Sequence, residues 1–134
     1  MVPDLPISAP GVNSVVIHDD YIEIIWDGAQ NVDKVRQTNL EAAKGAEILK
    51  SKGKPVLGSL LIRNHPLTPN IAAFQEVLKM FRATSPNRVV ICGTVSPMIM
   101  TLVATVTSSF NREIEIAYIA DPDAALSWLR SPKK

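Results

Sequence analysis

Hydrophobic and polar residues form blocks whose period changes along the chain. Two short runs rich in β-branched and aromatic residues come first, SVVIH at residues 14–18 and YIEIIW at residues 21–26. His18, Asp19 and Asp20 make the polar break between them. β-Branched and aromatic residues favour strands, and a short polar break between two such runs suits a tight turn. The pattern therefore predicts an N-terminal β-hairpin.

The segment from Asn31 to Lys52 has the period of an amphipathic helix. Charged residues occupy most of its surface, and Gly53 is a typical C-terminal stop. Small residues at the centre of the apolar face predict that the helix lies close against a sheet. The predicted inner face comprises Val32, Val35, Asn39, Ala42, Ala43, Ala46 and Leu49.

The rest of the chain repeats one unit, an apolar strand followed by a helix. The predicted strands are residues 55–62, 88–92 and 113–119. Each following helix is introduced by an N-cap residue and a proline, namely Thr68-Pro69, Ser96-Pro97 and Asp121-Pro122. Strand-helix units in series build parallel sheets. Together with the hairpin, they predict an α/β protein with a mostly parallel five-stranded sheet and about four helices.

The longest uncharged run lies between Arg88 and Arg112. A membrane-spanning helix needs about 20 consecutive apolar residues. Here the run begins with the β-branched triplet VVI, is broken at Gly93, and begins a helix at Ser96-Pro97 in its middle. We therefore interpret it as a buried strand followed by a helix, and we expect no transmembrane segment.

The helices of the first two strand-helix units differ in their outer faces. The helix over residues 70–83 has an ordinary division, with Ile71, Phe74, Val77, Leu78 and Phe81 inward and Gln75, Glu76, Lys79 and Arg82 outward. The helix over residues 97–110 is predicted to bury Ile99, Leu102, Val103, Val106 and Phe110. Its other face is uncharged: Met100, Thr101, Ala104, Thr105, Thr107 and Ser108. That face is either a covered or neutral solvated surface, or a contact surface whose desolvation costs little.

Length and composition place the chain among single-domain proteins. Its 134 residues suffice for one core, which we assign to residues 14–130. The segment 1–13 holds Pro3, Pro6 and Pro10 and is expected to be a flexible arm, and residues 131–134 a short tail. A formal charge of +1, with both signs mixed along the chain, argues against a nucleic-acid partner. A single cysteine and no basic, apolar leader predict a cytoplasmic protein.

Few residues suggest catalytic or metal chemistry. Ligands of open α/β sheets bind beyond the carboxyl ends of strands. This rule brings Arg63, Asn64, His65 and Thr68 near Cys92, Gly93, Thr94 and Ser96. A Cys92/His65 nucleophile pair is conceivable, although Cys92 continues a buried strand, where thiols are usually inert. The triplet His18-Asp19-Asp20 could ligate a metal, but a solvated turn is favoured. No glycine-rich phosphate loop is present, and we predict no cofactor.

The order of elements and the C-terminal segment IADPDAALSWLRS resemble the small bacterial STAS-like proteins. These are grouped with anti-sigma-factor antagonists and share their fold with CRAL-TRIO lipid-transfer domains. The resemblance covers about residues 14–130 and implies a protein that works by binding and has no catalytic activity. The residues that match the acidic start and the A-x-x-W-L finish of that group are Asp121, Ala124, Ala125, Leu126, Trp128 and Leu129.

In the anti-sigma-factor antagonists, a serine in an Asp-Ser-Ser-Gly type motif is phosphorylated at the start of the helix after the third strand. The matching segment here, residues 63–70, reads RNHPLTPN and has no Asp-Ser pair. A phosphate on Thr68 would face the positive end of the helix dipole. Thr68 and Asn70 are therefore candidates for a phosphoacceptor or anion site, and a plain N-cap is the favoured alternative.

The sequence thus predicts a non-enzymatic regulatory or interaction module that binds a protein partner or forms a homodimer. The predicted surface comprises His65, Met100, Thr101, Ala104, Thr105 and Ser108. The main alternative is a carrier of a small apolar ligand, with a cavity lined by Met100, Leu102, Val103 or Phe74. A small Cys/His enzyme is the least favoured of the three.

Overall fold

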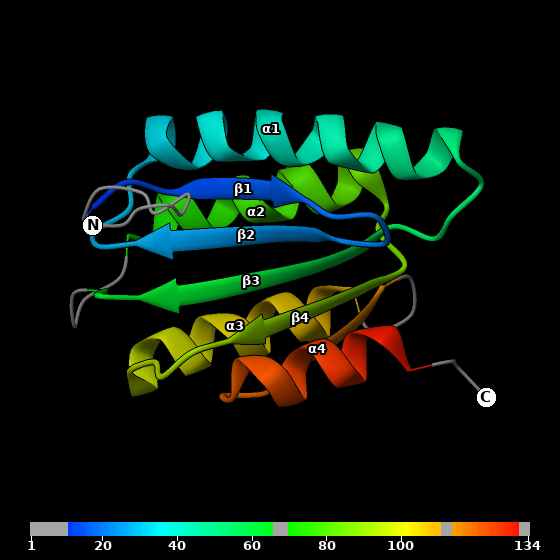
Figure 1. Ribbon diagram of the computed structural model, residues 1–134. Coiled ribbons are helices and arrows are strands. Elements are labelled where there is room, and N and C mark those ends of the chain that lie inside the picture. The colour runs from blue at the N-terminus through cyan, green and yellow to red at the C-terminus, as the bar shows by residue number, and fades with distance from the viewer. Residues whose placement is uncertain (1–10, 66–69, 111–113, 132–134) are drawn as a thin grey trace, which may run out of the picture.

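The computed structural model describes residues 11–65, 70–110 and 114–131. These ranges contain five strands and four helices, and Figure 1 shows how they are arranged. Their order is β1 (Ser14–Ile17), β2 (Ile22–Asp27), α1 (Val32–Ser51), β3 (Leu57–Arg63), α2 (Ile71–Thr84), β4 (Arg88–Cys92), α3 (Pro97–Ser109), β5 (Glu115–Tyr118) and α4 (Pro122–Arg130).

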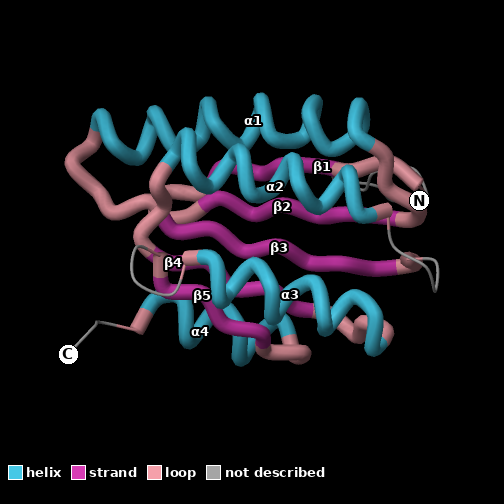
Figure 2. The backbone as a smooth tube through the Cα atoms, turned by 180° about the vertical axis from the view of Figure 1, so that it is seen from behind, coloured by secondary structure: helices cyan, strands magenta, loops and turns pink. Residues whose placement is uncertain are grey.

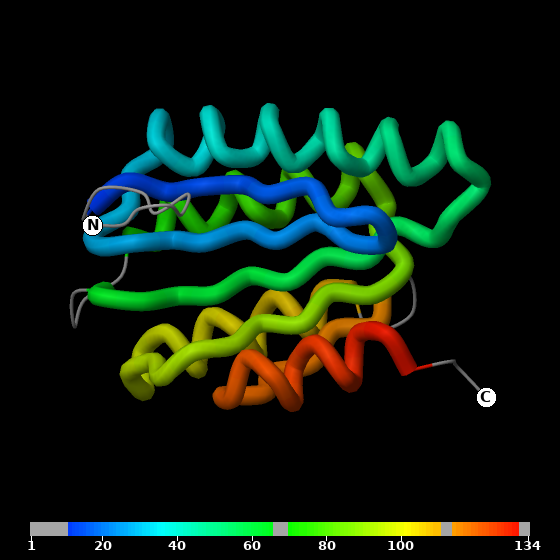
Figure 3. Tube along the Cα trace, viewed as in Figure 1, coloured from blue at the N-terminus to red at the C-terminus, as the bar shows by residue number. Residues whose placement is uncertain are grey.

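The strands form one sheet in which spatial order and chain order are the same, β1-β2-β3-β4-β5. β1 pairs with β2 antiparallel, and the other three pairings are parallel. The predicted hairpin, the α/β class and the mostly parallel five-stranded sheet are therefore confirmed. The chain can be followed through this series in Figure 3, from β1 in blue to α4 in red and orange.

Three helices cover one face of the sheet and the fourth lies on the other. Right-handed crossovers that all step in the same direction place their helices on one face. Figure 2 shows α1, α2 and α3 side by side on that face. They bury a large core against the sheet, in which Val35 and Leu49 are fully buried. Across the sheet, α4 packs on β3 and β4 and buries a smaller core around Val90 and Leu129.

Small residues bring α1 close to the sheet, as its alanine-rich stripe predicts. A Cβ added to Gly45 would lie 2.9 Å from Cγ1 of Ile22, and Ala42 and Ala46 are buried beside it. A pair of aromatic rings also holds the neighbouring helix, α2, against the sheet. Trp26 of β2 meets Phe74 of α2 edge to face, with 5.3 Å between ring centroids. The inner face of α1 also includes Thr38 and Gly45, which the apolar pattern does not mark.

Two residues of α2, one apolar and one charged, differ in exposure from the sequence prediction. Ile71 was expected inside, but it lies in the first turn and is 61% exposed. Glu76 was expected outside, but it is only 6% exposed. Arg36 of α1 and Lys79 of α2 hold its carboxylate at 3.1 and 3.0 Å, so ionic partners replace the water that a buried carboxylate loses.

The start of α2 also differs from the prediction. The N-cap is Asn70, whose side-chain oxygen accepts a hydrogen bond from the backbone N–H of Ala73 at 3.1 Å. α2 therefore begins at Ile71 with Asn70 as its cap, and the predicted opening pair Thr68-Pro69 lies outside the described ranges. The other two predicted caps are confirmed, because Ser96 caps α3 and Asp121 caps α4.

The uncharged run divides into β4 and α3, as the sequence indicates. Within the described ranges, no helix combines the length and hydrophobicity needed to cross a bilayer.

Two glycines with positive φ provide a matched test of the turn after β4. Gly93 has φ +101°, and a Cβ there would overlap the backbone oxygen of Ile62 in β3. Gly53 has φ +71° but open space around its Cβ position. We expect Gly93→Ala to lower the free energy of unfolding by about 3 kcal/mol or more, since steric overlap adds to the backbone strain. Gly53→Ala should cost about 1 kcal/mol. Urea denaturation of both variants measures the difference, and equal losses would contradict the predicted overlap.

Candidate functional site

A buried carboxylate organises the carboxyl ends of β2 and β3. Asp27 is 3% exposed. Its Oδ2 accepts a hydrogen bond from Nε of Arg63 at 2.9 Å, and its Oδ1 accepts one from Nδ2 of Asn64 at 3.1 Å. Asn64 reaches it from a left-handed backbone conformation, φ 52°, which asparagine adopts more readily than most residues. The backbone N–H of Gly11 also donates to this carboxylate.

These donors keep Asp27 charged. The hydrogen bond from Asn64, together with the bond and positive charge of Arg63, holds the pKa of Asp27 below its ordinary value, although burial acts in the opposite direction. A carboxylate with this many donors has little basicity left for proton transfer. We therefore interpret Asp27 as a structural anchor for the strand ends.

The side-chain amides of Asn13 and Gln30 form a second set of hydrogen bonds, which fixes the segment just before β1. Nδ2 of Asn13 donates to Oε1 of Gln30 at 2.7 Å and to Oγ1 of Thr38 at 3.0 Å. Oδ1 of Asn13 accepts the backbone N–H of Asp27 at 3.0 Å. Sequence reasoning did not identify this network. Its one local signal is a carboxylate at the end of the apolar run YIEIIW.

The loops after β3 and β4 meet, as the sequence predicts. Nε2 of His65 lies 3.1 Å from the backbone oxygen of Thr94. Arg63 and Asn64 belong to the Asp27 network described above, and Asn70 is occupied as the cap of α2. The candidate phosphoacceptor Thr68 lies outside the described residues.

Cys92 has the environment of an inert thiol. It is 3% exposed and packs in the smaller core with Ala125 and Leu129. Burial raises the pKa of Cys92 to about 11, and the carboxylates of Glu23 and Asp121 act in the same direction. A catalytic thiolate needs a lowered pKa and access to substrate. Both observations weigh against the Cys92/His65 pair.

The triplet His18-Asp19-Asp20 does not converge on one point. Nε2 of His18 lies 2.8 Å from Oε1 of Glu23, whereas Asp20 forms a two-pronged ion pair with Arg130 at 2.9 and 3.1 Å. The side chain of Asp19 is 91% exposed. Across residues 11–65, 70–110 and 114–131, no group of three or more His, Cys, Asp or Glu side chains is arranged to hold a metal ion.

The outer face of α3 is exposed and uncharged. Met98 is 53% and Met100 38% exposed, and a shallow concavity is lined by Thr101, Ala104, Thr105, Ser108 and Ser109. Three of the four hydroxyl groups that line it donate hydrogen bonds within their own helix. Oγ1 of Thr101 donates to the carbonyl of Pro97 at 3.1 Å, and Oγ1 of Thr105 donates to the carbonyl of Thr101 at 3.0 Å. Contact with a partner would therefore break few hydrogen bonds to water.

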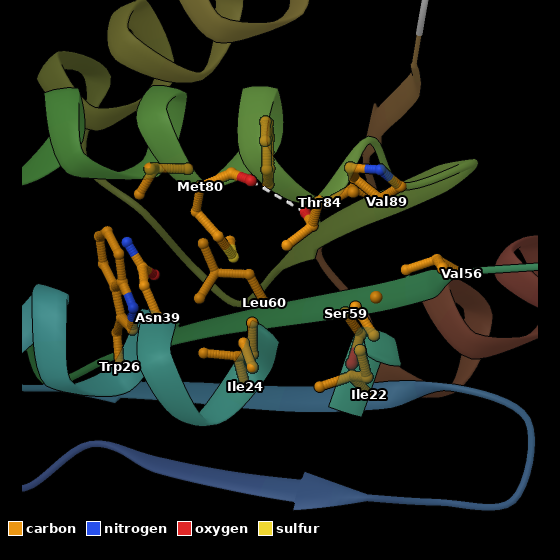
Figure 4. A pocket seen from close by; sticks show the side chains of 16 residues that line it. Ile22, Ile24, Trp26, Asn39, Val56, Ser59, Leu60, Met80, Thr84 and Val89 are labelled. Carbon is orange, nitrogen blue, oxygen red and sulfur yellow. Dashed lines mark hydrogen bonds between the residues drawn. The ribbon is translucent and has the colours of Figure 1, made fainter. Parts of the chain in front are cut away.

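An apolar cavity lies elsewhere, between α1, α2 and the central strands (Figure 4). Its volume is about 40 Å³, and its walls include Trp26, Leu60 and Met80. The carrier hypothesis placed a cavity at Met100, Leu102, Val103 or Phe74, and none of these residues lines this one. The available space is under α2, because small residues of α1 leave the seam between the two helices incompletely filled.

Comparison with known proteins identifies the fold. No protein-family model matches the chain, and no curated protein matches its sequence. A crystal structure of an uncharacterised protein from the DUF3478 family of Shewanella loihica PV-4, described as having a SpoIIAA-like fold, is similar with a TM-score of 0.60. The alignment covers 91% of this chain and 97% of that chain. The chain has a SpoIIAA-like fold. The STAS-like resemblance is thus confirmed, and at 19% identity the likeness concerns the fold alone.

The Asp27 network predicts a defined loss of stability in acid. Because the folded pKa of Asp27 is lowered, its contribution is complete above the unfolded pKa of about 4 and disappears as the pH falls through the folded value. At neutral pH, Asp27→Asn should lower the free energy of unfolding by about 2 kcal/mol. Urea denaturation between neutral and acid pH should show wild type and variant converging. Asp19→Asn, at an exposed site, is the control, and a constant gap across the pH range would contradict the prediction.

The environment of Cys92 predicts slow alkylation of the folded protein. With a pKa of about 11, only about one thiol in a thousand is ionised at pH 8, and burial blocks access as well. Mass spectrometry should find iodoacetamide labelling of the folded chain at least about tenfold slower than labelling in urea. Fast labelling of the folded protein at neutral pH would restore the Cys/His enzyme as a serious alternative.

Proposed function

We propose that this protein is a non-enzymatic interaction module that binds a protein partner through the outer face of α3. The observation that carries the proposal is the character of that face over Pro97–Ser109. It combines exposed methionine, alanine and threonine side chains with no charged residue. Neutral, flexible side chains suit contact surfaces because little charge is desolvated on binding.

The side-chain hydrogen bonds of α3 support the same interpretation. The hydroxyl groups of Thr101, Thr105 and Ser109 each donate to the carbonyl four residues earlier. Their donors are satisfied before any partner arrives, so no hydroxyl hydrogen at these three positions needs a new acceptor when a partner binds. The concavity between Thr101 and Ser109 is shallow, so a partner would lie against this face without entering a deep pocket.

The carboxyl edge of the sheet is a weaker candidate for the site of action. Ligands of open α/β sheets commonly bind there. Here the side chains at that edge hydrogen-bond to one another, because Arg63 and Asn64 both donate to Asp27. A ligand would have to displace these buried contacts, which costs more than covering a neutral surface.

A second copy of the chain is the first partner to test. In a symmetric dimer the same face lies on both sides of the interface, so one new charge appears twice. We expect wild-type protein to dimerise and the Ala104→Glu and Thr105→Glu variants to weaken the dimer by about a hundredfold or more, because like charges would be brought together. Native mass spectrometry and light scattering across a concentration series measure this.

Ala72→Glu is the matched control, because it makes the same substitution at an exposed position of α2. It should dimerise like wild type. Normal association of Ala104→Glu would reject the α3 face as the contact surface. A wild-type chain that stays monomeric at every concentration would reject self-association.

A further inference from the structure

Two methionines extend the uncharged face of α3 by one helical turn. Met98 precedes Thr101 by three residues, and the two side chains are therefore neighbours on the helix surface. Met100 precedes Ala104 by four residues, so it lies in line with the other side of the face. The two methionines are 53% and 38% exposed. A partner that covers the face as far as its N-terminal turn therefore covers two thioether groups.

A thioether group reacts with peroxides when its sulfur is accessible. An electron pair of the sulfur bonds to one oxygen of hydrogen peroxide, the O–O bond breaks, and the other oxygen leaves as water. The described ranges hold one further methionine, Met80. It is half-buried, and in Figure 4 it extends from α2 toward Leu60 of β3. Exposure therefore favours oxidation on α3.

The thiol of Cys92 competes poorly for the same oxidant. It is the one thiol of the chain, it is 3% exposed, and it packs in the smaller core. Burial raises the pKa of Cys92 to about 11. Peroxides attack the thiolate form, so this residue reacts slowly while the chain is folded.

A sulfoxide is poorly suited to the covered face of α3. Oxidation turns the apolar end of methionine into a polar S=O group, whose oxygen accepts hydrogen bonds. The face has few donors to offer, since the hydroxyl groups of Thr101, Thr105 and Ser109 donate to carbonyls of their own helix. A second copy of the face has the same shortage. A sulfoxide covered by it loses hydrogen bonds to water without an equivalent replacement.

We propose that Met98 and Met100 form a modification site for peroxides, and that their sulfoxidation releases the partner from α3. This inference rests on the proposed function of that face. Thiol-dependent sulfoxide reductases reverse the change, because the sulfoxide oxygen leaves as water while two thiols become a disulfide. The protein therefore binds its partner under reducing conditions and releases it in the presence of peroxide.

Peptide mapping by mass spectrometry measures the selectivity of the oxidation. After graded exposure of the folded protein to hydrogen peroxide, Met98 and Met100 should convert at least about tenfold faster than Met80. In urea, where all three sulfur atoms are accessible, the rates should be similar. Equal rates in the folded protein would overturn the modification site.

Native mass spectrometry and light scattering measure the effect on association. When both α3 methionines are oxidised, the dimer dissociation constant should rise about a hundredfold or more, since each subunit brings two unpaired acceptors. Treatment with methionine sulfoxide reductases and dithiothreitol should restore the original value. The double variant Met98→Leu/Met100→Leu keeps the apolar volume and forms no sulfoxide there, so its dimer should withstand peroxide. Met80→Leu is the matched control and should lose its dimer like wild type.

The outcomes separate this inference from the proposed function. A wild-type chain that is monomeric before peroxide contradicts the α3 dimer and, with it, the switch. A wild-type dimer that persists with Met98 and Met100 fully oxidised overturns the switch alone. Loss of the dimer in the peroxide-treated double variant overturns the assignment to these two residues. If the double variant does not dimerise, recovery of the wild-type dimer by the reductases decides, and failure to recover overturns the proposal.

Discussion

The identity of spatial and chain order in the sheet is the constraint on which the rest of the structure depends. Each strand pairs with the next, so every parallel connection steps in the same direction and α1, α2 and α3 fall on one face. Of the described helices, α4 alone serves the other face. The place where binding is proposed follows from this layout, because α3, at the end of the row, keeps an uncovered outer face.

Side-chain size in α1 then decides how well the layer is filled. Gly45, Ala42 and Ala46 let the helix backbone approach β2. The same small side chains cannot reach far toward α2, where the edge-to-face pair of Trp26 and Phe74 holds the helix in place. A cavity remains between them, at a cost to stability that better packing would recover. The bridge from Arg36 to buried Glu76 ties the outer side of the seam.

The carboxyl edge of the sheet shows why position in a fold does not by itself assign a function. The usual ligand position of an open α/β sheet is occupied here by Asp27, Arg63 and Asn64. Their polar groups hydrogen-bond to one another. Asn13 and Gln30 extend the same network to the entering chain. The polar groups of this edge are therefore used within the fold, whereas the outer face of α3 is exposed and carries no charged residue.

The sequence by itself determined the hairpin, the strand-helix series, the caps at Ser96 and Asp121 and the uncharged face of α3, because each follows from residues adjacent in the chain or one helical turn apart. Only the tertiary structure decided which distant side chains meet. Glu76 became buried because Arg36 of another helix reaches it, and Asp27 acquired partners from Arg63 and Asn64. The cavity depends on the spacing between α1 and α2, which no local pattern encodes, since packing gaps arise where two separately specified helices come together.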